Sequence, residues 1–363
     1  MAHRSKTRLN AKLRHVVIAN IAVIAILTAT NLFVKWLAQT SHIDEAHTQR
    51  KGAPVKPESQ SFPLSGQQIT ITHGSYSATI ATVGASLRTL TFEDRNLVTT
   101  FPADSVRPCF HGSTLVPWPN RLAGGRYTYS GVKQQVPVNE PERNNALHGL
   151  ATWTNWDIIK TSTSSVTLST LIVPQPGYPH AVEVLAAFSL SNSGLEWVVD
   201  AQNIGNTTAP YGVGIHPYLQ PQTDSLLDEW TTIVPADQIL QTSTDRLLPI
   251  DRHSVSEFEN GAYDFRTPRK IGTTKIDHAF TKLIDGHVTI TGPENRGVAL
   301  EWDAEQMPWV QLFTSDFGHP DFTRNGLAVE PVTCPPDAFN SGEDLVHLNP
   351  GSTHRTIWKV KAI

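Results

Sequence analysis

In Leu195-Glu-Trp-Val-Val-Asp-Ala201, apolar residues stand at every second position from Leu195 to Ala201, and this pattern indicates the fold class. Successive side chains of an extended strand point to opposite faces, so residues 195, 197, 199 and 201 would share one face. Glu196 and Asp200 would lie on the other face, in contact with water. A period of two with one buried face predicts a β-strand that covers a hydrophobic core.

Stretches rich in β-branched residues recur on both sides of this strand, from residue 62 to the end of the chain. They are Gln68–His73, Tyr76–Val83, Leu87–Phe92, Val166–Val173, Val182–Leu190, His287–Thr291, Val298–Trp302, Trp309–Thr314, Gly326–Glu330 and Thr356–Val360. The pattern predicts little helix, with one turn around Leu226–Trp230. Many short strands without intervening helices predict stacked antiparallel sheets. We therefore expect residues 62–363 to form one all-β domain, a large twisted antiparallel β-sandwich.

Charge is distributed unevenly along the 363 residues. Residues 1–60 carry nine Lys/Arg and three Asp/Glu, a net charge of +6, whereas residues 61–363 carry 20 and 30, a net charge of -10. An acidic body argues against nucleic-acid binding, which needs a basic face. Cys109 and Cys334 make neither a disulfide framework nor a zinc set, although they could form one bridge.

The N-terminal residues have the pattern of a membrane anchor. Residues 1–15 hold five Lys/Arg and no acidic residue, and Val16–Val34 is an uncharged run of nineteen residues. That length just spans a hydrocarbon core of about 30 Å. We predict a basic cytoplasmic tail over 1–15, a transmembrane helix over 16–38 and a flexible tether over 39–61, which places the β-domain outside the cytoplasm. A cleaved signal peptide, followed by secretion, is the main alternative, and a buried helix fits the polar flanks least well.

Gly212-Val-Gly-Ile-His-Pro-Tyr-Leu219 surrounds a single histidine with glycines and a proline. Pro217 restricts the backbone of His216 to extended conformations, and the glycines let other groups approach closely. Imidazole has the unperturbed pKa nearest to neutral pH, so it can give or take a proton there. We predict that His216 is the acid of a proton-transfer site, with a purely structural histidine as the alternative.

Two loops carry side chains suited to holding a sugar. Pro117-Trp-Pro-Asn-Arg-Leu122 is a rigid approach to Arg121, whose planar fork of donors suits hydroxyl and ring oxygens, unless it only covers a loop. The second loop puts His148 beside a glycine, from which it could reach into a cleft. Trp153 and Trp156 follow, and either could form an apolar floor for a sugar ring. The alternative is that they are core residues, which is favoured for Trp156.

Two carboxylates complete the candidate site. Asp277 in Lys275-Ile-Asp-His-Ala-Phe280 is flanked by apolar residues, so it needs hydrogen-bond donors if it is buried. Substrate hydroxyls or the backbone of a turn could supply them. Glu330 ends a short apolar strand and is followed at once by Pro331. Partial burial would raise its pKa toward the range of a general base, whereas the alternative is an exposed strand-end carboxylate.

These residues do not predict a metal or a cofactor. No pair among His148, His216, Asp277 and Glu330 has the H-x-x-x-H or H-x-H spacing that suits one metal ion. The sequence also lacks a P-loop, a dinucleotide-binding glycine fingerprint and a G-x-S-x-G nucleophile motif. We therefore expect chemistry that uses only the side chains of the protein.

Five motifs in this order resemble the aldose 1-epimerase (galactose mutarotase) family over roughly residues 62–363. They are Asn120-Arg121, Leu147-His148-Gly149, Gly214-Ile-His-Pro-Tyr218, Asp277-His-Ala-Phe280 and Glu330-Pro331. The resemblance implies a galactose mutarotase-like sandwich that interconverts the α and β anomers of a free glucose- or galactose-type sugar without a cofactor. It implies that Glu330 is the general base and His216 the general acid. The substrate would be held by Arg121, His148, Asp277 and Asn120.

The chain departs from this resemblance at two places. Most members of the family are soluble and cytosolic, so the N-terminal segment is unusual. Cys334 and Asp337 also follow closely after Glu330, which bears on the preferred sugar. The sequence leaves the oligomeric state open.

Three other functions fit part of the pattern. A non-catalytic carbohydrate-binding module would keep the tryptophans but would not need an acid and a base at rigid positions. A hexose-phosphate 1-epimerase would need basic residues to clamp the phosphate, and Arg88, Arg107 or Arg126 could serve. A glycosidase would need two carboxylates about 5–10 Å apart, for which Glu330 and Asp277 are the only candidates.

Overall fold

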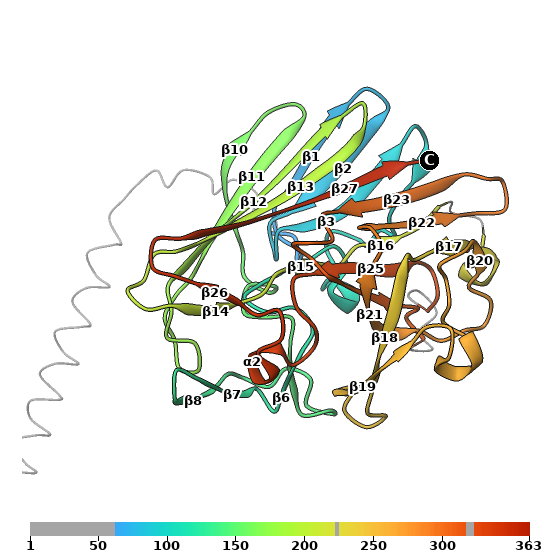
Figure 1. The fold of residues 1–363 in the computed structure, drawn as a ribbon. Coiled ribbons are helices and arrows are strands. Elements are labelled where there is room, and N and C mark those ends of the chain that lie inside the picture. The colour runs from blue at the N-terminus through green and yellow to red at the C-terminus, as the bar shows by residue number, and fades with distance from the viewer. Residues whose placement is uncertain (1–61, 222–224, 317–322) are drawn as a thin grey trace, which may run out of the picture. The chain divides into compact units, whose positions relative to one another are not determined.

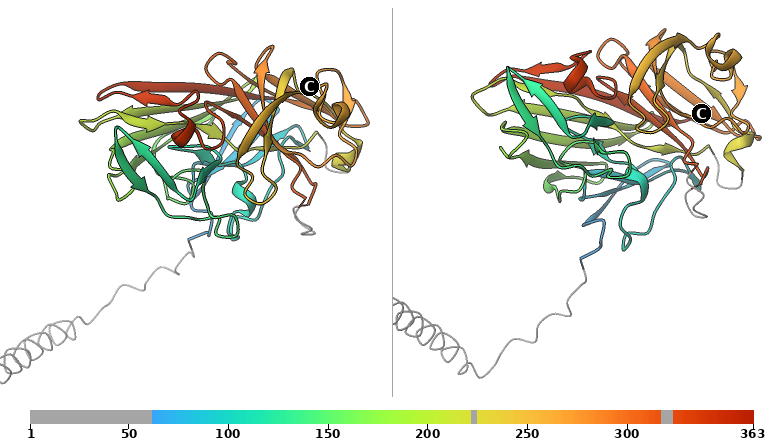
Figure 2. Two further views of the ribbon diagram at one scale, coloured as in Figure 1. Left: turned by 60° about the horizontal axis from the view of Figure 1, so that its bottom comes forward. Right: turned by 90° about the horizontal axis from the view of Figure 1, so that it is seen from below.

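The computed structural model describes residues 62–221, 225–316 and 323–363. Their regular structure is mostly β-strand (Figure 1; Figure 2). Every pairing between named strands in these residues is antiparallel. The predicted all-β antiparallel class is therefore confirmed, although the strands form several sheets rather than the two of a simple sandwich.

The largest sheet has nine strands and contains β13 near its centre. Its order is β10 (Asp157–Thr161), β11 (Ser165–Ile172), β12 (Val182–Ser191), β13 (Gly194–Asn203), β27 (Thr353–Ala362), β23 (Gly297–Trp302), β22 (His287–Thr291), β17 (Thr231–Ile233) and β20 (Arg269–Lys270). On β13, Leu195, Trp197 and Val199 are at most 1% exposed, whereas Glu196 and Asp200 between them are partly exposed. The alternation that predicted this strand is thus confirmed.

The second large sheet has eight strands. It consists of β19 (Pro249–Ser254), β18 (Ala236–Thr242), β21 (Asp277–Leu283), β24 (Trp309–Phe313), β25 (Leu327–Val332), β15 (Gly214–Ile215) and β5 (Thr114–Leu115), with β16 (Tyr218–Leu219) also on β25. β15 and β16 pair with the same strand, so they act as two halves of one interrupted strand. Three of the predicted site residues, His216, Asp277 and Glu330, lie on or beside these strands.

Smaller sheets and four short helices complete the described residues. One four-stranded sheet contains β1 (Gln68–His73), β2 (Tyr76–Ala81), β3 (Ser86–Phe92) and β4 (Arg95–Asn96). Three two-stranded sheets pair β14 (Ala209–Tyr211) with β26 (Val346–Leu348), β6 (Arg121–Ala123) with β9 (Asn145–Leu147), and β7 (Arg126–Tyr129) with β8 (Val132–Gln135). The helices are η1 (Pro108–Phe110), η2 (Leu227–Glu229), η3 (Phe258–Gly261) and α2 (Ala338–Ser341). In Figure 1, α2, β6, β7 and β8 gather at the bottom of the view.

The eleven strands predicted from the sequence are all present, with ends within three residues of the prediction. The predicted helical turn is also confirmed, as η2. The two- and three-residue strands were not predicted, since a period of two cannot be recognised in so few residues. Six longer strands were missed as well, because their sequences are more polar: β7, β8, β10, β18, β19 and β21.

One continuous hydrophobic cluster connects the two large sheets and the four-stranded sheet. Its largest fully buried members include Trp197, Trp230, Trp358 and Phe188. Among the described residues, no helix has the length and apolar character needed to cross a membrane. The predicted tail, anchor and tether, residues 1–61, lie outside the described residues.

Candidate active site

His216 and Glu330 face each other across the interrupted strand of the eight-stranded sheet. Gly214 on β15 pairs with Val332 on β25, and β16 pairs with β25 in the same register. His216, between β15 and β16, therefore lies opposite Glu330. Side chains that are directly opposite on neighbouring strands project from the same face, so these two are brought together by register alone.

The backbone around His216 is fixed by neighbours on both sides. The N–H of His216 donates to Ser113 O (3.0 Å), and its carbonyl accepts from the N–H of Gly112 (2.8 Å). On the other side, Pro217 O accepts from the N–H of Val329 (3.1 Å). The imidazole is thus held by paired backbone rather than by a mobile loop, as the sequence predicted for a rigid strand end.

The prediction that Glu330 ends its strand is wrong, because β25 continues through Pro331 to Val332. Proline has no N–H to donate, so it is tolerated in a strand where the ladder is interrupted. The break between β15 and β16 provides such an interruption beside Pro331. All six residues of β25 are buried and Glu330 is 2% exposed, so the exposed-carboxylate alternative does not apply.

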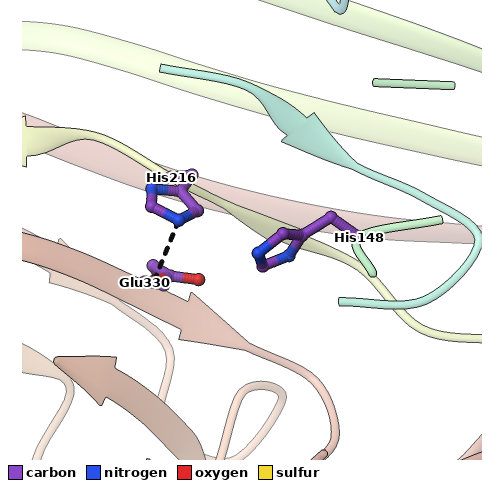
Figure 3. A group of neighbouring side chains, drawn as sticks. All are labelled: His148, His216 and Glu330. Carbon is purple, nitrogen blue, oxygen red and sulfur yellow. Dashed lines mark ion pairs between the residues drawn. The ribbon is translucent and has the colours of Figure 1, made fainter. Parts of the chain in front are cut away.

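His216 and Glu330 form a buried contact, with Nε2 of the imidazole 3.2 Å from Oε1 of the carboxyl group (Figure 3). Burial lowers the pKa of His216 to about 3. Burial also raises the pKa of Glu330 well above its usual range, and Asp277 raises it further. Both shifts arise because a low-dielectric interior disfavours charge on either group. The two groups are in contact and so titrate as a unit, and their opposite shifts favour a state in which the pair holds one proton.

His148 points at this pair from the β6–β9 sheet (Figure 3). His148 and Asn120 both have positive φ, 61° and 55°, which is uncommon outside glycine and costs backbone strain. Two hydrogen bonds hold them together: His148 N–H donates to Asn120 O (2.9 Å), and Asn120 N–H donates to His148 Nδ1 (3.1 Å). Burial keeps the pKa of His148 well below its usual value. A neutral imidazole that accepts at Nδ1 carries its proton on Nε2, so His148 offers a donor to the space beside Glu330.

The same three side chains could be taken for a metal site. One ligand atom each from His148, His216 and Glu330 lies within 4.8 Å of the others. The spacing rules applied to the sequence could not reveal this, since the three residues converge from separate strands. A metal needs an imidazole lone pair, but His148 uses its Nδ1 lone pair for the Asn120 N–H and carries its proton on Nε2. The cluster therefore fits proton transfer better than metal binding.

Arg121 is held between two carboxylates. Its Nε and Nη2 donate to Glu140 at 3.1–3.2 Å, and Nη2 lies 3.8 Å from Asp277. Glu140 is 5% exposed and also accepts from Asn145 Nδ2 (2.8 Å). A guanidinium fixed in this way presents its remaining donors in one orientation. Glu140 was not predicted, because it lies among other polar residues in an aperiodic loop.

Asp277 begins β21 instead of lying in the turn that was its alternative. Gln311 on β24 donates from Nε2 to Asp277 Oδ1 (2.7 Å). Burial raises the pKa of Asp277, while Arg121 lowers it. Gln311 is also directly opposite Glu330 on the neighbouring strand. It was not predicted, although a lone amide in the apolar strand Trp309–Phe313 was a usable signal.

The six residues predicted for the site all line one cleft of ≈ 280 Å³. They are Asn120, Arg121, His148, His216, Asp277 and Glu330. The rest of the lining was not predicted and consists of Cys109, Phe110, Asn139, Glu140, Glu142, Arg143, Leu147, Tyr218, Gln311 and Phe313. Segments far apart in the sequence thus converge on a single cleft.

The arginines suggested as a phosphate clamp are engaged elsewhere. Arg88 donates to Gln68 and Phe101 O, and Arg126 donates to Gln135 on the β7–β8 hairpin. Arg107 is buried against backbone carbonyls. None of these three arginines, all in the described part of the chain, lines the cleft.

The two cysteines, Asp337 and Trp156 were also singled out in the sequence. Among the described residues, Cys109 and Cys334 are both free thiols, so the bridge is not formed. Cys334 is buried, Asp337 accepts from the Ala123 N–H, and neither residue lines the cleft. Trp156 is a core residue, 1% exposed, as its alternative interpretation held.

This arrangement can be compared with known proteins. The family model for aldose 1-epimerase matches residues 67–361. The chain belongs to the aldose 1-epimerase family. It is 39% identical over 298 residues to the uncharacterized protein YihR of Escherichia coli (strain K12), which covers 82% of this chain and 93% of YihR.

Solved structures from the aldose 1-epimerase family share the fold. The GalM/aldose epimerase homologue from C. elegans has a TM-score of 0.71 and 18% identity, covering 82% of this chain and 99% of that one. Galactose 1-epimerase from Lactobacillus acidophilus NCFM has a TM-score of 0.67 and 18% identity, covering 81% and 94%. At such identities the likeness establishes the galactose mutarotase-like fold, and the chemistry must be argued from the cleft itself.

Proposed function

We propose that the protein is an aldose 1-epimerase that interconverts the α and β anomers of a free, uncharged hexose. The observation that carries this proposal is the buried contact of 3.2 Å between His216 Nε2 and Glu330 Oε1 at the cleft. Opening a cyclic hemiacetal needs a base at the C1 hydroxyl and an acid at the ring oxygen. Those two oxygens are bonded to the same carbon, so two groups in contact can reach both.

The proton shared by the pair is sufficient for the whole reaction. In the reactive tautomer Glu330 is ionised and His216 is protonated. Glu330 takes the proton of the C1 hydroxyl while His216 gives its proton to the ring oxygen, and the bond between C1 and the ring oxygen breaks. Rotation about the C1–C2 bond then presents the other face of the resulting aldehyde to the hydroxyl group that was the ring oxygen. The same two transfers then run in reverse, so the pair holds one proton before and after each step.

The other predicted residues would hold the sugar during this exchange. Arg121 and His148 supply N–H donors to ring or hydroxyl oxygens, whereas Asp277 accepts from hydroxyls. Asn120 lines the cleft and also fixes its neighbours, since its backbone N–H donates to His148 and its Oδ1 accepts from the Arg121 N–H (2.8 Å). Binding groups that are already held in place lose little entropy when the sugar arrives.

The charge of the cleft supports a neutral sugar over a hexose phosphate. Among the described residues, its lining includes two arginines, Arg121 and Arg143, and four carboxylates, Glu140, Glu142, Asp277 and Glu330. Both arginines already lie within ion-pair distance of Glu140. A phosphate dianion would find little uncompensated positive charge there.

The remaining alternatives fit the pair less well. A carbohydrate-binding module has no need for a buried acid and base, whose desolvation is unfavourable. A retaining or inverting glycosidase places a second carboxylate across the bond from the first. The group in contact with Glu330 is an imidazole.

Polarimetry on freshly dissolved α-glucose and α-galactose tests this function, with full-length protein and with EDTA present throughout. Faster mutarotation of either sugar supports the proposal. Measurable sugar binding without acceleration of either sugar would favour the non-catalytic module.

The pH dependence of the rate tests the shared proton. Activity should fall in acid as the pair gains a second proton, and in alkali as it loses its only one. Because the pKa of His216 is lowered to about 3 and that of Glu330 is raised, the maximum should be a broad plateau between the two. A single transition at the ordinary pKa of histidine would contradict the shared proton.

We also propose that residues 16–38 anchor the protein in a membrane, with the epimerase domain on the extracytoplasmic side. This rests on the basic residues of 1–15 and the uncharged run Val16–Val34. Protease added to intact spheroplasts that express the full chain should digest the domain. A fully protected domain would contradict the anchor, and a shortened protein in the medium would indicate a cleaved signal peptide.

A further inference from the structure

Trp153 is a large aromatic side chain held at the surface beside the cleft. It is 47% exposed, whereas Trp156 on the same segment is 1% exposed and donates its indole N–H to Ala151 O (3.1 Å). The core packing of this segment is therefore provided by Trp156. Trp153 leaves much of its apolar surface in water, where a ligand could cover it.

One face of the Trp153 indole packs against Arg107. The guanidinium of Arg107 lies over the ring, 4.6 Å from its centroid. Arg107 is itself 3% exposed and donates to Val83 O (2.8 Å), Ser86 Oγ (2.6 Å) and Thr152 O (2.5 Å). One face of the indole is thus stacked on a buried, fixed cation. A ring held in this way loses little conformational entropy when a ligand stacks on it.

Phe110 connects this indole to the proposed active site. Its ring centroid lies 5.5 Å from that of Trp153 and 4.6 Å from that of His148. Phe110 lines the cleft, whereas Trp153 lies just beyond the lining. The two aromatic rings therefore extend the wall of the cleft outward from His148 to Trp153.

We propose that Trp153 and Phe110 form a second saccharide subsite, which binds the next sugar unit when the reducing-end unit of an oligosaccharide occupies the cleft. A pyranose has an apolar C–H face that can stack on an aromatic ring while its hydroxyls remain at the rim in water. Ring opening requires a free C1 hydroxyl on the unit in the cleft. The second unit must therefore be attached through one of the other hydroxyls, which makes the ligand a reducing disaccharide or longer saccharide.

The proposed subsite rests on the proposed function. Comparing a monosaccharide with disaccharides as substrates distinguishes a failure of the subsite from a failure of the function. Anomer exchange of glucose, 4-linked maltose and 6-linked melibiose can be measured by polarimetry or exchange NMR with the full-length protein. Trp153→Ala should lower kcat/KM about tenfold for at least one disaccharide, mainly through KM, and change that for glucose less than twofold. Trp153→Phe should retain most of the disaccharide activity because it keeps a flat ring. Ile159→Ala, an exposed apolar residue on β10, is the matched control and should change none of the three.

Two results would overturn the subsite. Equal losses for glucose and both disaccharides would mean that Trp153 serves the first sugar, and no loss for any of them would mean that it binds no sugar. If the wild-type protein accelerates no sugar, the proposed function fails, and calorimetry then tests the subsite by itself. Tighter binding of a disaccharide than of glucose, removed by Trp153→Ala, would still support it, and equal binding would overturn it.

Discussion

Strands β13 and β25 are both interior strands of antiparallel sheets, but they bury different side chains. β13 buries an apolar residue at every second position and leaves Glu196 and Asp200 partly exposed. β25 buries all six of its residues, and one of them is Glu330. The same backbone pattern thus covers a core in one sheet and encloses an ionisable group in the other.

The acidic side chains of the two strands therefore lie in different environments. On the solvent face of the nine-stranded sheet, Asp200 pairs with Arg355 (2.7 Å) and Glu196 lies near Lys359 (4.0 Å). Exposed pairs of this kind contribute about 0–1 kcal/mol, because water screens them. Glu330 has no such screening, so burial raises its pKa, which suits the role of general base that we propose for it. A buried carboxylate in an otherwise apolar strand lowers stability, because its charged form is desolvated. The function that we propose would account for this cost.

The largest expected effect comes from breaking the buried pair. Glu330→Gln and His216→Asn should each lower the mutarotation rate by ~10²–10⁴-fold, the usual contribution of one proton transfer. The double variant should be little worse than either single one, since the two groups act as a unit. Sugar binding measured by calorimetry should largely survive in all three.

Glu196→Gln and Asp200→Asn on β13 are the matched controls and should leave the rate unchanged. Near-normal turnover in a folded single variant would refute the acid–base assignment. Asp277 or His148 would then be the next candidate.

The contrast between the strands also explains what the sequence could predict. β13 was recognisable because, between Leu195 and Ala201, every residue except Val198 obeys one rule, apolar inside and polar outside. Glu330 was recognisable as unusual because it interrupts an apolar run, but the extent of β25 was not. Pro331 suggested an end to the strand, and only the break between β15 and β16 on the neighbouring strand makes that proline acceptable.

Residues that act through pairing across the fold were missed. Glu140 acquires its role because the β6–β9 pairing brings Arg121 against it, and nothing in its local sequence encodes that contact. The short range of sequence patterns also hides the approach of His148 to His216 and Glu330. The family motifs could indicate these residues individually, but their geometry depends on strand register between distant segments.

The opposite perturbation is to break β13. Trp197 is fully buried and packs on Phe188, with ring centroids 4.7 Å apart. Trp197→Ala should lower the free energy of unfolding by ~3–5 kcal/mol through lost burial and the cavity left behind. Urea unfolding followed by circular dichroism measures this. Below the transition, kcat should be unchanged, and a lower kcat in the folded variant would contradict the separation of core and site.

An intermediate effect is expected at the edge of the site. Arg121→Ala should weaken sugar binding by ~1–3 kcal/mol, because polar partners are left unpaired. Glu140→Gln should weaken binding less, since it only loosens the orientation of Arg121. Adding Glu140→Gln to Arg121→Ala should then weaken binding no further, which calorimetry can test as a double-mutant cycle. Additive losses would show that Glu140 contacts the sugar independently.

The smallest effect is on stability, and it has a definite sign. The pKa of Glu330 is raised by burial above its ordinary value of 4.5 in the unfolded chain. Its contribution to stability is therefore fully present below about pH 4.5 and is lost as the pH rises toward the raised pKa. Glutamine cannot ionise, so Glu330→Gln should be more stable than the wild-type protein by about 0.5–2 kcal/mol at neutral pH, and the difference should shrink toward pH 4.5.

Because His216 titrates together with Glu330, the same comparison is repeated in the His216→Asn background, where any pH dependence of the gain comes from Glu330 alone. Asp200→Asn on β13 provides the control and should change stability by less than about 1 kcal/mol, because its ion pair is exposed. Urea unfolding of these proteins between pH 4.5 and pH 8 is the measurement. A gain for Glu330→Gln that does not vary with pH would show that packing, and not the ionisation of a buried carboxyl group, distinguishes β25 from β13.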